Sequence, residues 1–210
     1  MRPPYFSPPM PENQHPAKRL VGRVRRLFPS GRDPKAQENY HVLHNVPLFR
    51  NLPKGALRDL ADAVHRRDYK RDEFLYYEHD PGLGMYIVQK GRVRLLVEDN
   101  AGVVHELRQV GEHEYFGKLS LLGDFRRVES AQAITETRVL GFFRPDLKTI
   151  IKRHPGSGAT IIEAVARNLA ALQAEITRVL VEKDGKVEAL RMMDNAASRI
   201  ELLPTEMPAP

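Results

Sequence analysis

Alternating apolar and polar positions fill the middle of the chain and predict seven short β-strands. These strands are expected at residues 64–70, 73–79, 84–89, 92–98, 103–109, 128–134 and 137–143. Residues that turns require lie between them, as in Asp80-Pro81-Gly82 and Asn100-Ala101-Gly102. Many short strands at this spacing favour an antiparallel sandwich or jelly roll over a parallel sheet.

Apolar residues change to helical spacing on both sides of the strands. Before them, a helix is predicted from about Pro53 to Val64, with Pro53 suited to its first turn. After them, a short helix is predicted over Pro145 to His154, where Pro155 and Gly156 stop it. The fold class is therefore mainly β with flanking helices.

A longer helix is predicted over about residues 159–183, and its apolar positions step by 3, 4, 3, 4 and 3 residues. This seam consists of Ile162, Val165, Leu169, Leu172, Ile176 and Val179. A helix that packs on its own domain also needs an apolar stripe, but a narrow seam of this period favours a helical partner. We therefore expect a homodimer through the seam, with one more short helix over residues 186–202.

A distinctive stretch, GEHEYFGKLSLLGDFRRVESAQA, occupies residues 111–133. Phe116 and Gly117 interrupt an extended run, and a short apolar turn of helix follows. A polar loop then delivers Arg126 and Arg127. Glycine allows close backbone approach, a helix start offers free N–H groups, and arginine forks onto phosphate oxygens. The stretch therefore predicts a small phosphate cradle inside the roll.

This stretch resembles the phosphate-binding cassette of the cyclic nucleotide-binding domain family, which reads F-G-E-(L/I)-(A/S)-L-L, four residues, then R-(S/T)-A. Two further segments are similar to the family: VPLF at Val46–Phe49, and EHDPGLGMYIVQKGRVRLL at residues 78–96. The resemblance spans roughly residues 42–180 and implies a double-stranded β-helix jelly roll followed by a long helix. It also implies a site for cyclic AMP or cyclic GMP, with these ligand-binding residues: Phe116, Gly117, Lys118, Leu119, Ser120, Arg127, Val128 and Glu129.

Two positions depart from the family pattern. Lys118 stands where the family has the glutamate that holds the ribose 2′-hydroxyl, and Glu129 stands where it has a small residue. A lysine has no acceptor for that hydroxyl, and a carboxylate repels a phosphate. We expect Lys118 and Glu129 to pair with each other or with Arg127. Family-style nucleotide binding and a degenerate or altered-ligand pocket both stay open.

The formal charge of +6 is confined to one segment. Residues 17–35 carry seven basic residues and one acidic residue, so the rest of the chain is neutral on balance. Basic and apolar residues alternate at helical spacing over residues 17–28. Such a helix docks on the body or on a partner subunit, lies on an anionic membrane, or binds nucleic acid, with docking favoured.

Other sequence features limit the location and the chemistry. The chain has no cysteine, no apolar signal sequence and no apolar run of membrane-spanning length, which favours a cytoplasmic protein. Metal-dependent jelly rolls need an H-x-H motif. None exists, since His105 and His113 are eight residues apart and the His41–His44 pair has no evident third ligand. We therefore expect neither an enzyme nor a metal site.

Together these features predict four segments. Residues 1–39 form a lead, 40–155 the cyclic nucleotide-binding roll with its flanking helices, 156–184 a dimerising helix, and 185–210 a short helix and tail. The last segment is too short for the winged helix-turn-helix of related transcription regulators, which weighs against DNA binding. The expected function is a cyclic nucleotide-binding sensor that signals through an unknown effector protein. The alternative is a dimeric scaffold with no nucleotide or with an altered anionic ligand.

Overall fold

The computed structural model of the chain describes residues 33–201, with side chains through residue 198. The chain divides into two compact units, Met1–Pro34 and Lys35–Pro210, and nearly all described residues belong to the second. The basic segment at residues 17–28 and the end of the predicted tail lie outside the described residues. No helix in the described part is both long and apolar enough to cross a membrane.

Between residues 33 and 201, eight strands form two four-stranded antiparallel sheets. The strands are β1 (His65–Tyr69), β2 (Phe74–Tyr76), β3 (Gly84–Lys90), β4 (Val93–Glu98), β5 (Val104–Val110), β6 (Tyr115–Phe116), β7 (Ser130–Ala133) and β8 (Thr137–Phe143). One sheet has the order β1-β8-β3-β6 and the other β2-β7-β4-β5. The predicted mainly β jelly roll is confirmed.

Strand β3 is central because both of its faces are covered. Met85 and Ile87 are fully buried in the apolar cluster that the roll shares with the helices. Val88 belongs to a second cluster between the sheets, against which Tyr86 packs. Tyr86 pairs with Phe116 of β6, which places one end of β3 at the start of the predicted phosphate cradle.

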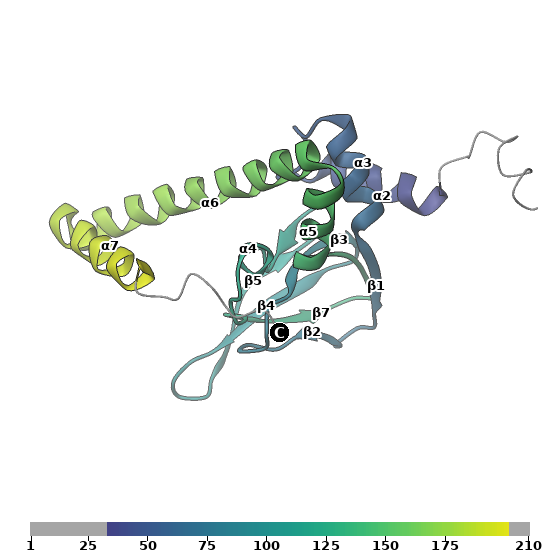
Figure 1. Ribbon diagram of the computed structural model, residues 1–210. Coiled ribbons are helices and arrows are strands. Elements are labelled where there is room, and N and C mark those ends of the chain that lie inside the picture. The colour runs from purple at the N-terminus through teal and green to yellow at the C-terminus, as the bar shows by residue number, and fades with distance from the viewer. Residues whose placement is uncertain (1–32, 202–210) are drawn as a thin grey trace, which may run out of the picture. The chain divides into compact units, whose positions relative to one another are not determined.

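Six helices accompany the sheets within the described residues. They are α2 (Pro34–Asn45), α3 (Lys54–Ala63), α4 (Leu119–Leu122), α5 (Arg144–Arg153), α6 (Pro155–Asp184) and α7 (Lys186–Glu201). Figure 1 shows α2, α3 and α5 gathered near the first half of α6. The predicted helices after residue 53 are all present, and the long one begins at Pro155.

The sequence did not predict α2, which begins before the expected start of the body at residue 40. Residues 34–39 therefore belong to this helix and not to the predicted lead. Most of its residues are polar, so its apolar spacing is weak. Long-range bonds hold it instead: Asn39 Nδ2 donates to the Ala61 carbonyl at 3.0 Å, and Arg66 Nε donates to Asn39 Oδ1 at 2.8 Å. These contacts join residues that are far apart in the sequence, so the local pattern of apolar residues does not predict them.

Strand ends also differ from the predictions near the cradle. The two-residue strand β6 was not predicted because its alternation is too short to recognise. Strand β7 begins at Ser130, so Val128 and Glu129 lie in the preceding loop and not in a strand. Strand β2 ends at Tyr76, since the Tyr77 N–H donates to Asp80 Oδ2 at 2.8 Å in a turn.

The apolar seam of α6 is divided between two environments. Val165 is fully buried in the chain's own core, and Ile162 and Leu169 pack against that core. Leu172, Ile176 and Val179 are 42%, 46% and 47% exposed. The prediction that the whole seam faces a partner is therefore wrong for Val165, which is already covered. The exposed second half remains available to a partner.

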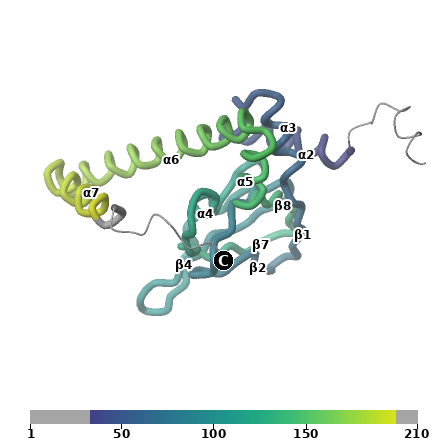
Figure 2. The backbone as a smooth tube through the Cα atoms, viewed as in Figure 1, coloured from purple at the N-terminus to yellow at the C-terminus, as the bar shows by residue number. Residues whose placement is uncertain are grey.

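Helix α7 turns back along the second half of α6, as the tube in Figure 2 shows. Ala189 of α7 is fully buried, and Thr177 Oγ1 donates to Met193 Sδ at 3.3 Å across the pair. The two helices therefore form a hairpin beyond the roll.

Candidate functional site

A cavity of about 510 Å³ opens beside the cradle. Its walls come from the cradle, from β4 and β5, and from α6. The lining residues are Pro47, Leu95, Leu107, Arg108, Glu114, Tyr115, Phe116, Gly117, Lys118, Leu119, Ser120, Arg126, Arg127, Val128, Glu129 and Leu172. All eight residues predicted for the site line this one cavity, which has the size of an ordinary small-molecule site.

Gly117 and Arg127 are fitted to each other at the cavity wall. Gly117 has a φ of +70°, a conformation that strongly favours glycine. Arg127 Nη1 donates to the Gly117 carbonyl at 3.1 Å. A Cβ atom on Gly117 would lie 2.3 Å from that nitrogen. The backbone conformation therefore favours glycine, and any Cβ at this position would also displace the guanidinium that lies against it.

The guanidinium of Arg127 is held by aromatic rings and not by a carboxylate. Arg127 is only 5% exposed, and its Cζ lies 4.2 Å from the Tyr76 ring centroid and 5.7 Å from that of Tyr86. Burial raises the pKa of Tyr86, while the charge of Arg127 opposes this rise. Within the described part of the chain, Arg127 Nε is buried without a hydrogen-bond partner. Such a buried donor without a partner is rare in folded proteins.

Glu129 forms a hydrogen bond with Tyr76, the tyrosine whose ring contacts Arg127. The Tyr76 hydroxyl donates to Glu129 Oε1 at 3.0 Å. Burial raises the pKa of Tyr76 well above its usual value, and the negative charge of Glu129 adds to the rise. The hydroxyl therefore stays protonated and occupies one carboxylate oxygen.

Lys118 points the other way, toward α6. Its Nζ donates to Asn168 Oδ1 at 2.5 Å and lies 5.6 Å from the Tyr115 ring centroid. Burial lowers the pKa of Lys118, and the nearby positive charge of Arg108 lowers it further. Since Lys118 bonds to Asn168 and Glu129 to Tyr76, the predicted pairing of Lys118 and Glu129 with each other or with Arg127 is wrong.

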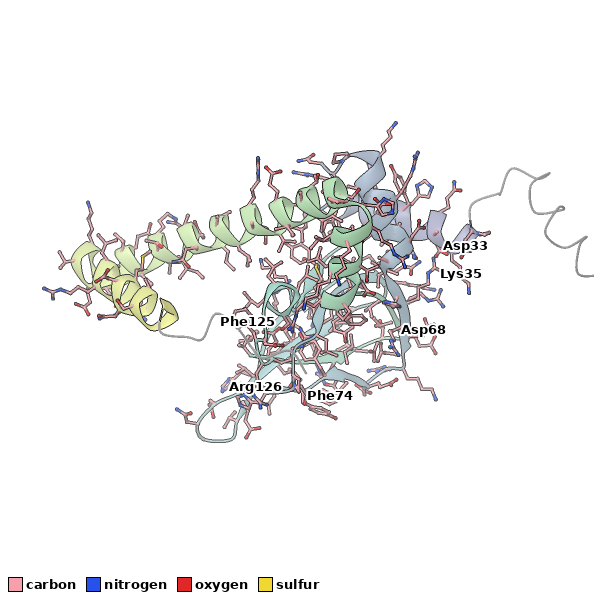
Figure 3. All side chains as sticks on the ribbon, in the orientation of Figure 1. Asp33, Lys35, Asp68, Phe74, Phe125 and Arg126 are labelled. Atoms are coloured by element: carbon pink, nitrogen blue, oxygen red, sulfur yellow. The ribbon has the colours of Figure 1, made fainter. Side chains whose placement is uncertain are left out.

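The remaining predicted residues shape the cradle. Ser120 is buried, and its Oγ donates to the Phe125 carbonyl at 3.3 Å, which closes the loop after α4. Figure 3 places Phe125 and Arg126 in that loop. Leu119 and Val128 are 42% and 60% exposed and form an apolar rim.

Sequence reasoning missed the residues that distant segments bring to the site: Tyr76, Tyr86, Asn168 and Leu172. The two tyrosines lie in predicted strands, and Asn168 and Leu172 in the predicted long helix, but nothing local distinguishes them from other residues there. Only the tyrosines could have been anticipated, since an arginine expected inside the cradle should have aromatic or acidic neighbours. No cluster of three or more potential metal ligands occurs among residues 33–198.

Comparisons with known proteins agree with this geometry. Residues 66–154 match the family model of the cyclic nucleotide-binding domain. The chain is 34% identical over 154 residues to the cyclic AMP receptor protein of Thermus thermophilus. This alignment covers 73% of this chain and 66% of that protein. The chain is 30% identical over 109 residues to a cAMP-dependent protein kinase regulatory subunit of Emericella nidulans, covering 52% of this chain and 26% of that protein.

Among solved structures, the N-terminal domain of a transcriptional regulator from Streptomyces coelicolor A3(2) is similar to this chain, with 30% sequence identity and a TM-score of 0.59. The match covers 64% of this chain and 94% of that domain. The chain spans about two thirds or less of the length of the first curated relatives it matches, at 66%, 36% and 57%.

Proposed function

The chain belongs to the cyclic nucleotide-binding domain family, and on that premise we propose that it is a regulatory module whose cavity binds a phosphate-bearing ligand of the cyclic nucleotide type. The observation that carries this proposal is the buried Arg127 guanidinium at the cavity wall, which keeps an unpaired Nε. A buried cation without a carboxylate partner is stabilised by a bound anion.

The cavity suits the other parts of a nucleotide as well. Leu95, Leu107, Val128 and Leu172 offer apolar surface that a base or a sugar can cover. Gly117 brings the backbone close to Arg127, so a phosphate at that guanidinium also lies near the start of α4. Cyclic AMP and cyclic GMP are the proposed ligands, and no metal ion is needed to hold either.

The signal would leave through α6. Lys118 lies in the cavity wall and donates a hydrogen bond to Asn168 of α6. Leu172 of the same helix lines the cavity directly. A ligand that binds one arrangement of α6 better than another shifts the balance between them. In this proposal the receiver is a partner protein in the cytoplasm, and the module has no catalytic role and does not bind DNA itself.

The proposed assembly is a homodimer through the exposed half of the seam on α6. Leu172, Ile176 and Val179 follow one another at spacings of 4 and 3 residues and are each more than two-fifths exposed. The proposed division is a roll with its flanking helices at 40–155, which α2 extends back to Pro34, a dimerising helix at 156–184 and a short helix and tail from 185.

A second candidate function is a dimeric scaffold whose cavity has lost the family ligand or takes another anion. Lys118 favours it, because a lysine cannot accept a hydrogen bond from a ribose hydroxyl. Its bond to Asn168 also shows that the side chain is already engaged.

Calorimetric titration of the full chain with cyclic AMP and with cyclic GMP tests the proposal. We expect saturable binding that Arg127→Ala weakens at least about tenfold, which corresponds to one charge-assisted contact. Arg127→Lys should also weaken binding, since an ammonium does not reproduce the guanidinium fork. Arg138→Ala is the matched control, because Arg138 is exposed, pairs with Asp68 and does not line the cavity. Absence of binding, or binding unaffected by Arg127→Ala, would favour the scaffold.

A further inference from the structure

Among the described residues, three cations of the cavity wall lack a carboxylate partner: Lys118, Arg126 and Arg127. Arg126 is exposed to solvent, whereas the other two are not. Lys118 bonds to a neutral amide, and Arg127 bonds to a carbonyl and lies over tyrosine rings. The ion pairs formed by the described side chains include neither residue. Both side chains are partly or largely buried, so water compensates their charges less well than at the surface.

The two carboxylates of the cavity are committed elsewhere. Glu114 accepts a hydrogen bond from the Gly111 N–H at 2.6 Å, and its other oxygen lies 3.9 Å from Arg108. Glu129 accepts from the Tyr76 hydroxyl. Four basic and two acidic side chains therefore line the cavity, and the excess positive charge includes Lys118 and Arg127.

We propose that the cavity selects a nucleotide carrying two separate anionic groups, one bound by Arg127 and the other by Lys118, with Lys118 as the specificity-determining residue. This inference rests on the part of the proposed function that puts a phosphate at Arg127, and it prefers a nucleotide with a second anionic group over cyclic AMP and cyclic GMP in the same cavity. A cyclic phosphodiester carries one negative charge and satisfies one cation. A phosphate monoester carries about 1.5 to 2 charges at pH 7, and a second one satisfies the other cation.

Binding at Lys118 has a consequence for α6. The ammonium now donates to Asn168, a neutral acceptor. A phosphate oxygen makes a stronger, charge-assisted bond to the same ammonium. The ammonium has three N–H donors, so the phosphate acts on the Asn168 bond by drawing Nζ toward the ligand. The ligand class that Lys118 selects is therefore the class that loosens the Lys118–Asn168 link. A ligand that leaves Lys118 alone keeps the link in place.

Titrations of the full chain with adenosine 3′,5′-bisphosphate and with adenosine 3′,5′-cyclic monophosphate test this ligand class, because the two share base and sugar. We expect the bisphosphate to bind at least about tenfold more tightly, and its affinity to fall more steeply with salt. Lys118→Met should abolish the preference, and Lys118→Arg should keep it. Arg126→Met is the charge-matched control: Arg126 lines the same cavity, but its Nη1 bonds to the His79 carbonyl.

The outcomes separate the inference from the function on which it rests. If cyclic AMP binds in an Arg127-dependent way and the bisphosphate binds no better, the inference is wrong and the proposed function stands. An equal loss of preference in Lys118→Met and Arg126→Met would show that any positive charge in the cavity produces the preference. That result would also overturn the inference. If neither ligand binds, both the inference and the proposed function are wrong.

Discussion

The guanidinium of Arg127 lies over the ring of Tyr76, with 4.2 Å between Cζ and the ring centroid, while the hydroxyl of the same tyrosine donates to Glu129. One tyrosine therefore supports the cation and also binds the carboxylate that would otherwise be free beside it. This relationship explains how the chain keeps Glu129 two residues after the arginine without an ion pair between them.

Tyr76 should contribute to stability through both contacts. Tyr76→Phe keeps the ring under Arg127 and removes the bond to Glu129, so the free energy of unfolding should fall by about 1 kcal/mol. Tyr76→Leu removes the ring as well and should cost at least about 1 kcal/mol more. Urea unfolding of both variants measures the two steps. Equal stability of the Phe and Leu variants would show that the ring contact contributes nothing.

The raised pKa of Tyr76 predicts a pH dependence. The folded state holds the proton more tightly than the unfolded state, whose tyrosine keeps its value of about 10.0. Below pH 10 the contribution is complete, and it declines as the pH rises above the unfolded pKa. The stability difference between the unmodified protein and Tyr76→Phe should therefore shrink from pH 9 to pH 11. A constant difference over that range would contradict the assignment.

Gly117 should tolerate no side chain. Gly117→Ala introduces a Cβ 2.3 Å from Arg127 Nη1 and places alanine at a φ of +70°, so we expect a loss of about 1–3 kcal/mol in unfolding free energy and weaker ligand binding. Gly55→Ala is the matched control, because nothing lies within 4 Å of a Cβ there and the residue is in helix α3. That control should be neutral or stabilising by up to about 1 kcal/mol. Similar losses in the two variants would refute the fitted Gly117–Arg127 contact.

Lys118 and Glu129 should behave independently in a double-mutant cycle. Because each has its own partner, the stability effects of Lys118→Met and Glu129→Gln should add within about 0.5 kcal/mol. The cycle of Lys118→Met with Asn168→Ala should show a larger coupling, since those residues are bonded. Chemical denaturation of the single and double variants gives both values. Strong coupling of Lys118 to Glu129 would restore the pairing that the sequence suggested.

Dimerisation should depend on the exposed half of the seam. Leu172→Glu together with Ile176→Glu should give monomers with an intact roll, because both side chains are exposed in the single chain. Val165→Ala is the contrasting variant: it should lower stability by about 1 kcal/mol or more through lost core packing, yet leave the mass unchanged. Sedimentation equilibrium at micromolar concentration measures the mass. An unmodified chain that is monomeric there would end the dimer proposal.

The sequence by itself determined the roll and most of the cradle. Strand alternation, turn residues and helical spacing are local properties, so they predict elements wherever each element is long enough to show its period. The cradle was predictable for the same reason: Gly117 and Arg127 lie ten residues apart in one continuous stretch. The two-residue strand β6 and the polar helix α2 were not predicted because neither shows a periodic spacing of apolar residues.

Only the tertiary structure decided which side chains meet inside the cavity. Lys118 finds Asn168, fifty residues later, and Glu129 finds Tyr76, fifty-three residues earlier. Opposite charges at two changed positions of one cavity suggested a pair, yet Lys118 bonds to Asn168 of α6 and Glu129 to Tyr76 of β2. The seam of α6 was divided in the same way, because its spacing is uniform along the helix while the core that it shares with α3 and α5 covers only its first half. A periodic pattern specifies an apolar face, and the packing of distant segments specifies what covers it.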